Sequence, residues 1–272
     1  MDPVQALVLG IVQGATEFLP VSSSGHLALV PWLLGWPAPG LAFDAFLHLG
    51  TILAVIAYFW RDLLSLAGAW LQSLRDRSLA GSPERKVAWL ILLGTVPAVV
   101  AGLLLEDFFE GLFANPAAVG VFLLVTAALL AASERWSRQE RRAEEMSWLD
   151  GLLVGIGQAC AIAPGLSRSG TTIAAGLWRG LTRPVAARYS FLLSVPIVLG
   201  AGLLQARKLL SGVEVPWLPL ALGFLASAVV GYLCIHFLLA FLQRRRLYPF
   251  AIYCAAAGAL TLALVALGWS GL

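Results

Sequence analysis

Residues 163–172 read APGLSRSGTT and interrupt an apolar region, residues 148–182, near its middle. Residues 13–26, QGATEFLPVSSSGH, interrupt a second apolar region, residues 1–36, in the same way. In both regions Pro, Gly and clustered Ser break the run of helix-forming residues, because Pro ends a helix and Ser favours the cap of the next one. Each region therefore predicts two short helices joined at a tight tip.

The composition predicts an integral membrane protein. Of the 272 residues, 60% are hydrophobic and only 12% are charged, whereas a soluble domain has about 25% charged residues. So few polar side chains could not cover the surface of a water-soluble globule. The same numbers exclude a disordered or collagen-like chain. A disulfide scaffold is excluded because Cys160, Cys234 and Cys254 lie in apolar runs without framework spacing.

Six further stretches are long and apolar enough to cross the hydrocarbon layer, which takes roughly 20 residues. Irregular backbone cannot face lipid, since its polar groups would lack hydrogen-bond partners, so the two broken regions must be buried against protein or line a watery cavity. We predict an all-α polytopic membrane protein with six transmembrane helices and two re-entrant helical hairpins. The predicted spans are about residues 42–60, 87–105, 116–133, 186–205, 217–241 and 249–269.

Charge in the polar links predicts the orientation. Basic residues gather in the links 61–86, 134–147 and 243–247, whereas the charged residues of the link 106–115 are all acidic. Six crossings and two hairpins put the three basic links on one side, which the positive-inside rule assigns to the cytoplasm. We expect a bacterial plasma (inner) membrane, both termini outside and contact with membrane lipids. Nucleic acid is not an expected partner, because no basic stripe occurs outside these links.

The two broken regions also share six residues at a constant spacing of 145 residues. Chance is a weaker explanation than duplication, because the matches fall on the segments that the breaks already set apart. We interpret residues 1–272 as one membrane domain of two repeats, 1–133 and 148–269, each a hairpin followed by three spans. An odd number of crossings inverts the second repeat, so the two tips would enter from opposite sides and meet within the membrane. The matched pairs are Gly10/Gly155, Ile11/Ile156, Gln13/Gln158, Ser22/Ser167, Ser24/Ser169 and Gly25/Gly170.

The first tip carries a carboxylate. Gln13 and Glu17 lie four residues apart and share a helix face before Pro20 ends the helix. A carboxylate at membrane depth is energetically costly and usually functional; the alternative is that Glu17 only caps the next helix or bonds a serine. Hydroxyls and an imidazole beside it favour the functional role. These neighbours are Ser22, Ser23, Ser24 and His26.

The second tip carries a lone guanidinium, Arg168, which we expect to face the acidic first tip. A helix N-terminus offers free N–H groups and a positive dipole end, and Arg presents a planar fork suited to phosphate oxygens. We predict a pocket for a phosphate-bearing anion; the alternative is that Arg168 pairs with Glu17 or a carbonyl as a structural group only. The residues expected to hold the anion with Arg168 are Gly165, Ser167, Ser169, Gly170 and Thr172.

Three other polar residues carry weaker signals. Asp44 and His48 lie four residues apart at the start of the first span. They could line the outer mouth or bind a phosphate, and a helix-capping role at the membrane interface is equally well supported. His236, in the apolar run LCIHFLL, is predicted to be a buried structural imidazole.

At both tips the sequence closely resembles the undecaprenyl-diphosphatase family, the bacitracin-resistance membrane phosphatases. That family has a (Glu/Gln)-x-x-x-Glu motif, matched by Gln13 and Glu17, and then a Ser-rich stretch ending in Gly-His, matched by VSSSGH at 21–26. Its second motif, Pro-Gly-x-Ser-Arg-Ser-x-x-Thr, is matched by residues 164–172. The resemblance covers essentially the whole chain. Some members have Glu where this chain has Gln13, which would change the affinity for a metal.

The resemblance implies hydrolysis of undecaprenyl diphosphate to undecaprenyl phosphate and inorganic phosphate, which recycles the lipid carrier for peptidoglycan synthesis. It also implies a divalent cation, Mg²⁺ or Ca²⁺. Glu17 would hold the cation, with Gln13, or act as a base. Arg168 and the hydroxyls of both tips, including Ser22 and Ser24, would hold the diphosphate. Ser23 or His26 would be the nucleophile or the proton donor, and the sequence does not divide these roles.

The main rival function is a transporter or flippase of a phosphate-bearing lipid or anion, because inverted repeats with broken helices are typical of carriers. A carrier needs no nucleophile, so the cluster of Ser23, His26 and Glu17 opposite Arg168 favours catalysis. A purely structural assembly factor would leave the polar tips unexplained. We expect an active site that opens outward on a polyprenyl diphosphate lipid, and the sequence leaves open whether the protein forms a homodimer.

Overall fold

The computed structural model describes residues 2–210 and 217–269, and most of them are helical. Within these residues, six helices are long and apolar enough to cross a membrane. The predicted class, an all-α polytopic membrane protein, is confirmed. The six helices are α3 (Leu41–Asp76), α4 (Pro83–Leu104), α6 (Pro116–Trp136), α9 (Arg183–Leu210), α10 (Trp217–Leu242) and α11 (Tyr248–Ala266).

Two helices depart from the predicted layout. α3 continues to Asp76 rather than ending near residue 60, and the short helix α5 (Glu106–Phe113) occupies the acidic link. The extension of α3 packs beside the start of α4, where Trp89 Nε1 donates to Ser73 Oγ at 2.9 Å and Arg85 pairs with Asp76 at 2.6 Å. Hydropathy marks where apolar residues stop, which need not be where the helix stops.

Four shorter helices form the two hairpins: α1 (Pro3–Phe18) with α2 (Ser23–Leu34), and α7 (Trp148–Cys160) with α8 (Arg168–Trp178). The longest of the four, α1, has 16 residues, and at about 1.5 Å per residue it is about 24 Å long. The hydrocarbon layer is about 30 Å thick, so none of these helices crosses it alone. Their breaks fall where the sequence predicted them, with Ser22 capping α2 and Ser167 capping α8.

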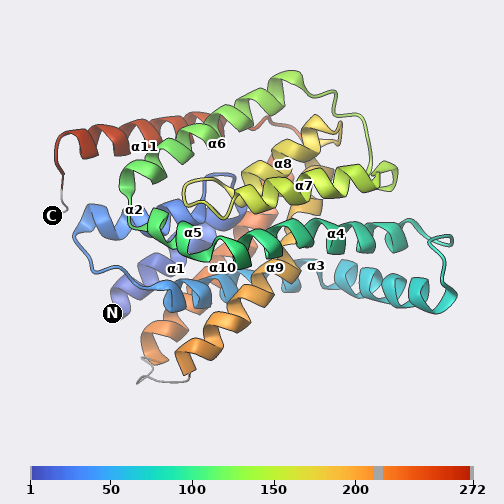
Figure 1. The fold of residues 1–272 in the computed structure, drawn as a ribbon, viewed down its shortest axis with the longest axis horizontal. Helices are drawn as coiled ribbons and strands as arrows, with labels where there is room; N and C mark the ends of the chain where they lie inside the picture. The colour runs from blue at the N-terminus through green and yellow to red at the C-terminus, as the bar shows by residue number, and fades with distance from the viewer. Residues whose placement is uncertain (1, 211–216, 270–272) are drawn as a thin grey trace.

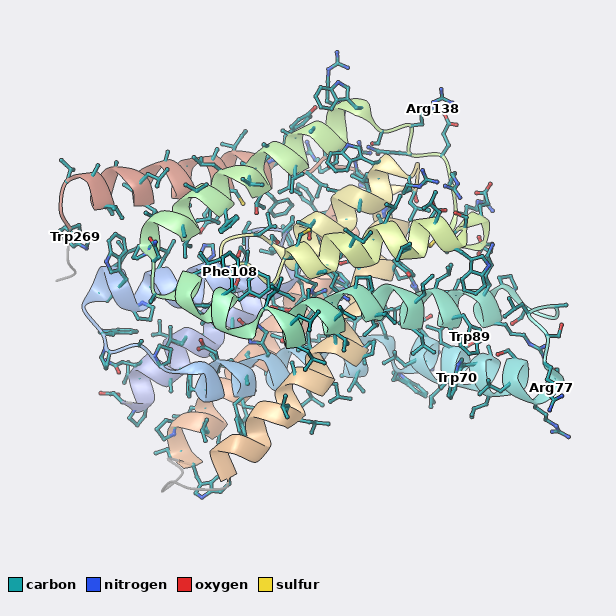
Figure 2. The ribbon with its side chains drawn as sticks, viewed as in Figure 1. Trp70, Arg77, Trp89, Phe108, Arg138 and Trp269 are labelled. Atoms are coloured by element: carbon teal, nitrogen blue, oxygen red, sulfur yellow. The ribbon has the colours of Figure 1, made fainter. Side chains whose placement is uncertain are left out.

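The basic links that follow α3 and α6 lie at one end of the molecule, and the start of α1 and the end of α11 lie at the other (Figure 1). Arg77 and Arg138, from the links that follow α3 and α6, lie at the right of Figure 2, and Trp269, near the end of the described chain, lies at its left. α1 begins at the left beside the N-terminus, whereas α7 begins at the right (Figure 1). The hairpins therefore enter the helical bundle from opposite ends.

Glycines allow the first helix of each hairpin to rest directly on a long helix. A Cβ atom at Gly10 would lie 2.3 Å from the carbonyl oxygen of Gly223 on α10. A Cβ atom at Gly155 would lie 2.5 Å from the carbonyl oxygen of Gly94 on α4. Neither position has room for a side chain, so α1 packs on α10 and α7 packs on α4 backbone to backbone.

The tips of the two hairpins touch inside the bundle. Ser169 Oγ donates to the carbonyl oxygen of Leu19 at 3.2 Å. Thr126 of α6 donates to the carbonyl oxygen of Gly165 and accepts from the N–H of Ser167, both at 3.0 Å. The φ angle of Gly165 is +94°, in the left-handed region that favours glycine. Protein groups thus satisfy irregular backbone that could not face lipid.

Candidate active site

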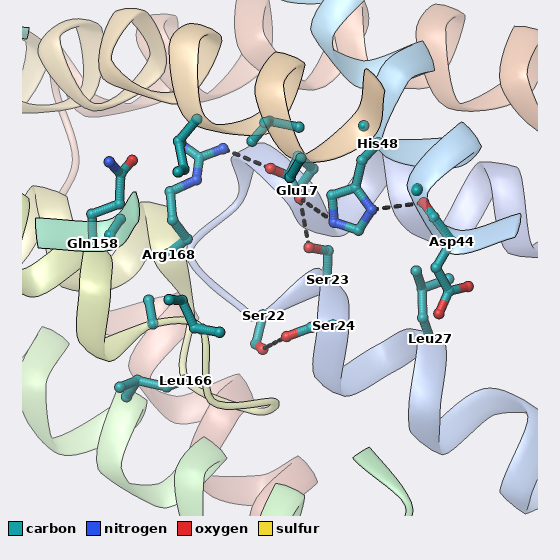
Figure 3. Close-up of a pocket in the computed structure, with 18 of the residues that line it drawn as sticks. Glu17, Ser22, Ser23, Ser24, Leu27, Asp44, His48, Gln158, Leu166 and Arg168 are labelled. Carbon is teal, nitrogen blue, oxygen red and sulfur yellow. Dashed lines mark hydrogen bonds and ion pairs between the residues drawn. The ribbon is translucent and has the colours of Figure 1, made fainter. Parts of the chain in front are cut away.

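Glu17, buried near the end of α1, gathers polar groups from both tips (Figure 3). Arg168 Nη2 donates to its Oε1 at 2.6 Å, and Ser23 Oγ donates to its Oε2 at 2.6 Å. Gln13 Nε2, one turn earlier on α1, donates to Oε2 at 3.1 Å. His48 Nε2 on α3 lies 3.6 Å from the same oxygen. One carboxylate therefore joins a hydroxyl from the first hairpin and a guanidinium from the second.

α3 supplies His48 and orients its ring. His48 Nδ1 lies 2.8 Å from the carbonyl oxygen of Asp44. A carbonyl only accepts, so Nδ1 carries a proton and Nε2 faces Glu17. From the sequence, a role in the site and a helix-capping role were equally well supported for Asp44 and His48. In the structure both residues line one cavity with Glu17. Asp44 Oδ1 is buried there without a hydrogen-bond partner among the described residues.

Arg168 is the first residue of α8 and is held at both ends. Its backbone lies in the first turn of the helix, which is fixed by a hydrogen bond from the N–H of Gly170 to Ser167 Oγ at 3.0 Å. At its side chain, Nη1 donates to the carbonyl oxygen of Ser190 on α9 at 3.2 Å. The side chain is only 15% exposed. A guanidinium held this way presents a fixed fork to an anion in the cavity.

The other predicted anion-binding groups of the second tip bond within the protein. Ser167 Oγ and Ser169 Oγ lie 3.3 Å apart, and Thr172 Oγ1 lies 2.6 Å from Ser190 Oγ. These hydroxyls hold the tip that carries Arg168. Direct contact with an anion stays a prediction for the residues in this group, which are Gly165, Ser167, Ser169, Gly170 and Thr172.

His26 is a predicted site residue whose ring is engaged away from Glu17. Its Nδ1 lies 2.7 Å from the carbonyl oxygen of Ser22, and its Nε2 lies 2.6 Å from the hydroxyl of Tyr253 on α11. Because the carbonyl only accepts, Nδ1 carries the proton and Nε2 accepts from Tyr253. No sequence signal marked Tyr253, which lies in an apolar helix.

The polar groups line a cavity of about 310 Å³. Ser22, Ser23 and Ser24 line it together with Glu17 and Arg168. The long helices α3, α4 and α9 contribute residues from the ends that lie nearer the chain termini, and most of these are apolar. The cavity therefore lies toward the end of the molecule opposite the basic links.

A second cavity, of about 470 Å³, adjoins the first. The two share Leu27, Asp44 and Phe113 in their linings. The second cavity continues past Trp32 and Trp36, with a mainly apolar lining from α2 and the start of α6. The polar site and this apolar groove thus lie next to each other.

One prediction outside the site is wrong. His236 is not buried: its side chain is exposed on α10, with Nδ1 3.2 Å from the hydroxyl of Tyr58. Apolar neighbours in a membrane helix can face lipid as well as protein, so an apolar run does not reveal which residues are buried.

Two residues of the site fit a divalent cation in part. Gln13 Oε1 is buried and has no hydrogen-bond partner among the described residues, and the amide nitrogen of the same side chain lies 3.1 Å from Glu17 Oε2. Exchanging the amide oxygen and nitrogen by a flip would turn an oxygen toward Glu17. Within residues 2–210 and 217–269, no group of three or more His, Cys, Asp or Glu could hold a metal. The residues fit Mg²⁺, which is commonly held by one or two protein oxygens together with substrate phosphates and water.

Comparison with known proteins finds matches over nearly the whole chain. A family model described as bacitracin resistance protein BacA matches residues 6–260. The chain is 46% identical over 273 residues to an undecaprenyl-diphosphatase of Methanosphaera stadtmanae, covering 97% of this chain and 98% of that one. It is 48% identical to an undecaprenyl-diphosphatase of Rubrobacter xylanophilus, with 98% and 100% covered, and 44% identical to one of Pelobacter propionicus, with both chains covered completely.

Proposed function

Because this chain belongs to the bacitracin resistance protein BacA family, we propose that Ser23, Glu17 and Arg168 carry out the hydrolysis of undecaprenyl diphosphate. The activity is that of an undecaprenyl-diphosphatase, the name of its full-length relatives. It releases inorganic phosphate and leaves undecaprenyl phosphate, the lipid carrier of cell-wall synthesis. The three residues supply a hydroxyl, a carboxylate and a guanidinium to one cavity.

The hydrogen bond from Ser23 to Glu17 carries the proposal. A serine hydroxyl attacks phosphorus only as its proton leaves, and Glu17 Oε2 accepts that hydrogen bond at 2.6 Å, within reach for a general base. Ser23 Oγ bonds to the terminal phosphorus, the bond from phosphorus to undecaprenyl phosphate breaks, and Glu17 takes the proton. Water then breaks the bond between Ser23 and phosphorus and releases phosphate. His26 is engaged by Ser22 and Tyr253, which favours Ser23 as the nucleophile.

Arg168 is the group that offsets the negative charge of the phosphoryl group. Phosphoryl transfer depends mainly on positioning and on neutralising charge on the transferred group. The guanidinium already reaches into the cavity beside Ser23, and the hydroxyls of Ser22 and Ser24 line the same space. A carrier would need this anion site but not a hydroxyl bonded to a carboxylate, so this arrangement favours the enzyme over the flippase.

We expect Gln13 and Glu17 to contribute the protein oxygens for a divalent cation, Mg²⁺ or Ca²⁺. When bound there, the ion would offset charge on the diphosphate oxygens. The unpartnered Oε1 of Gln13 supports this assignment.

The surroundings of the site support a lipid substrate and an orientation. The apolar groove past Trp32 and Trp36 would receive the first part of the prenyl tail, with the rest lying among membrane lipids. We propose a bacterial inner membrane with the basic links in the cytoplasm. Both termini and the mouth of the cavity would then lie outside. Both tips come from one chain, so the chemistry needs no second subunit. A homodimer is compatible with this arrangement.

Phosphate release from C55 diphosphate by the purified protein tests the proposal. We expect release that falls with a chelator and returns with Mg²⁺ or Ca²⁺. Glu17→Gln should lose activity at every metal concentration, because the amide cannot act as the base. An unchanged metal titration in Glu17→Gln would assign Glu17 a structural role. Binding of the lipid without any phosphate release would favour the transporter.

A further inference from the structure

Gln158 lies beside the site with an unpartnered amide oxygen. α7 places it in the lining of the cavity that holds Glu17 and Arg168, and its side chain is only 2% exposed. Its Nε2 donates to the carbonyl oxygen of Gly94 at 3.4 Å. That carbonyl only accepts, so the amide orientation is determined and Oε1 is the end turned away from it. Oε1 has no hydrogen-bond partner in the part of the chain that the structure describes. A buried acceptor left unpaired is unfavourable, so a partner from outside the chain is expected.

The position of Gln158 suits a role opposite the nucleophile. In Figure 3 Arg168 lies between Gln158 on one side and Glu17 and Ser23 on the other. Displacement at phosphorus is in line, with the entering and leaving oxygens on opposite sides. Water that attacks a phosphoryl group on Ser23 must therefore approach from the side away from Ser23. Gln158 offers an acceptor for a water O–H on that side.

We propose that Gln158 is a positioning residue that holds the attacking water in the second step. The inference rests on the proposed function, in which Ser23 carries the phosphoryl group. Oε1 of Gln158 accepts one O–H of the water, and the water oxygen bonds to phosphorus as the bond from phosphorus to Ser23 Oγ breaks. Glu17 returns to Ser23 Oγ the proton that it took in the first step, and both water protons stay on the released phosphate, which leaves as dihydrogen phosphate. The amide only orients the water, as a glutamine does in GTPases.

Gln13, the residue matched to Gln158 at the spacing of 145, has a different partner. Both side chains are buried with an unpartnered Oε1. The Nε2 of Gln13 donates to Glu17, whereas the Nε2 of Gln158 donates to backbone. Gln13 is therefore tied to the carboxylate, whereas Gln158 is not, and its Oε1 is available to a water.

Transient kinetics of Gln158→Met tests the proposal, because Met fills a similar volume without the acceptor. We expect kcat to fall about tenfold or more and KM to fall with it, so that kcat/KM stays nearly unchanged, since the hydrogen bond is lost only in the second step. Undecaprenyl phosphate should then appear in a burst of one equivalent per enzyme, ahead of inorganic phosphate, and phosphorylated Ser23 should accumulate. Gln158→Glu keeps an acceptor and should show a smaller burst.

Two results would overturn the inference. One is a normal kcat in Gln158→Met. The other is a slow enzyme without a burst, because a structural defect slows both steps together. Ser23→Ala, assayed in parallel, separates a failure of the role proposed for Gln158 from a failure of the proposed function. If Ser23→Ala keeps its activity, the proposed nucleophile is wrong; if it is inactive and Gln158→Met gives no burst, only the role of Gln158 is wrong.

Discussion

The two hairpins share one framework and carry different chemistry. In each, a serine caps the second helix with its hydroxyl, Ser22 in the first hairpin and Ser167 in the second. The next residue is Ser23 in the first and Arg168 in the second, and both donate to Glu17. The comparison shows how two similar turns can present a hydroxyl to Glu17 from one side and a guanidinium from the other.

The backbone at the two caps differs as well. Ser22 has a φ angle of +73°, in the left-handed region, whereas Ser167 has −69°. A residue other than glycine in the left-handed region costs about 1–3 kcal/mol, and such residues cluster at active sites. In the second tip the left-handed residue is Gly165, where the conformation is unstrained. The strain therefore lies in the hairpin that carries Ser23.

The bases of the hairpins differ most. Asp150, at the start of α7, is fully buried and pairs with Arg141 at 2.8 Å and Arg179 at 2.5 Å. Arg141 also donates to the carbonyl oxygen of Arg179 at 2.6 Å, which ties the two ends of the second hairpin together. The matching position in the first hairpin is the neutral residue Gln5. We expect the second hairpin to be the more rigid of the two.

Arg168→Ala should have the largest effect, because it removes the contribution of the second hairpin to the site. We expect no measurable phosphate release. We also expect a loss of about 1–3 kcal/mol in the free energy of unfolding, since Glu17 loses its counter-charge but keeps its bonds from Ser23 and Gln13. Thermal unfolding in detergent measures the second effect. The double variant Arg168→Ala with Glu17→Gln should regain part of the lost stability and none of the activity. If Arg168→Ala alone keeps most of its activity, the account is contradicted.

Ser23→Ala tests the contribution of the first hairpin. We expect kcat to fall by about three orders of magnitude or more, the size of loss seen when a nucleophile is removed. Ser24→Ala is the matched control, because Ser24 Oγ lies in the same cavity but is 3.4 Å from Ser22 Oγ and only weakly bonded. It should lose less than about tenfold. Equal losses in the two variants would mean that the hydroxyls bind substrate and that neither attacks.

Alanine at the glycine contacts sharpens the comparison of the two packing faces. Gly10→Ala and Gly155→Ala should each lower the free energy of unfolding by about 1–3 kcal/mol, because the new Cβ would overlap backbone on α10 or α4. Gly68→Ala in α3 is the control, since no atom of the described residues lies within 4 Å of the Cβ that it would add. It should be neutral or raise stability by up to about 1 kcal/mol. A loss in only one hairpin would show that the two contacts are not equivalent.

Much of this architecture was predictable because it depends on local signals. Pro20 and Gly165 break helices wherever they lie, and the odd number of spans between the tips predicted that Glu17 and Arg168 would face each other. The structure brings these two side chains together. Their catalytic roles stay predictions, as does the internal duplication, which the matching caps and glycine contacts support.

The features of the site that the sequence did not predict depend on tertiary packing. Tyr253 and Ser190 lie in apolar spans, and nothing in their local sequence shows that they face a tip rather than lipid. The partner of His26 was therefore not predictable, nor was the proximity of His48 to Glu17. Gln158 was visible only as the counterpart of Gln13, and its unpartnered oxygen could be found only from the structure.

Cross-linking of the two tips tests the central claim most directly. A Cβ atom at Gly170 would lie 3.5 Å from Cβ of Pro20, within the range of about 3.5–4.5 Å found in disulfides. The variant Pro20→Cys with Gly170→Cys would be oxidised and then cut by a protease at a site inserted in the link 134–147, with the single-cysteine variants as controls. The native thiols to be replaced by Ala are Cys160, Cys234 and Cys254. The account predicts that the halves stay joined without reductant and separate with it. Halves that separate without reductant, in a folded protein, would contradict the meeting of the tips.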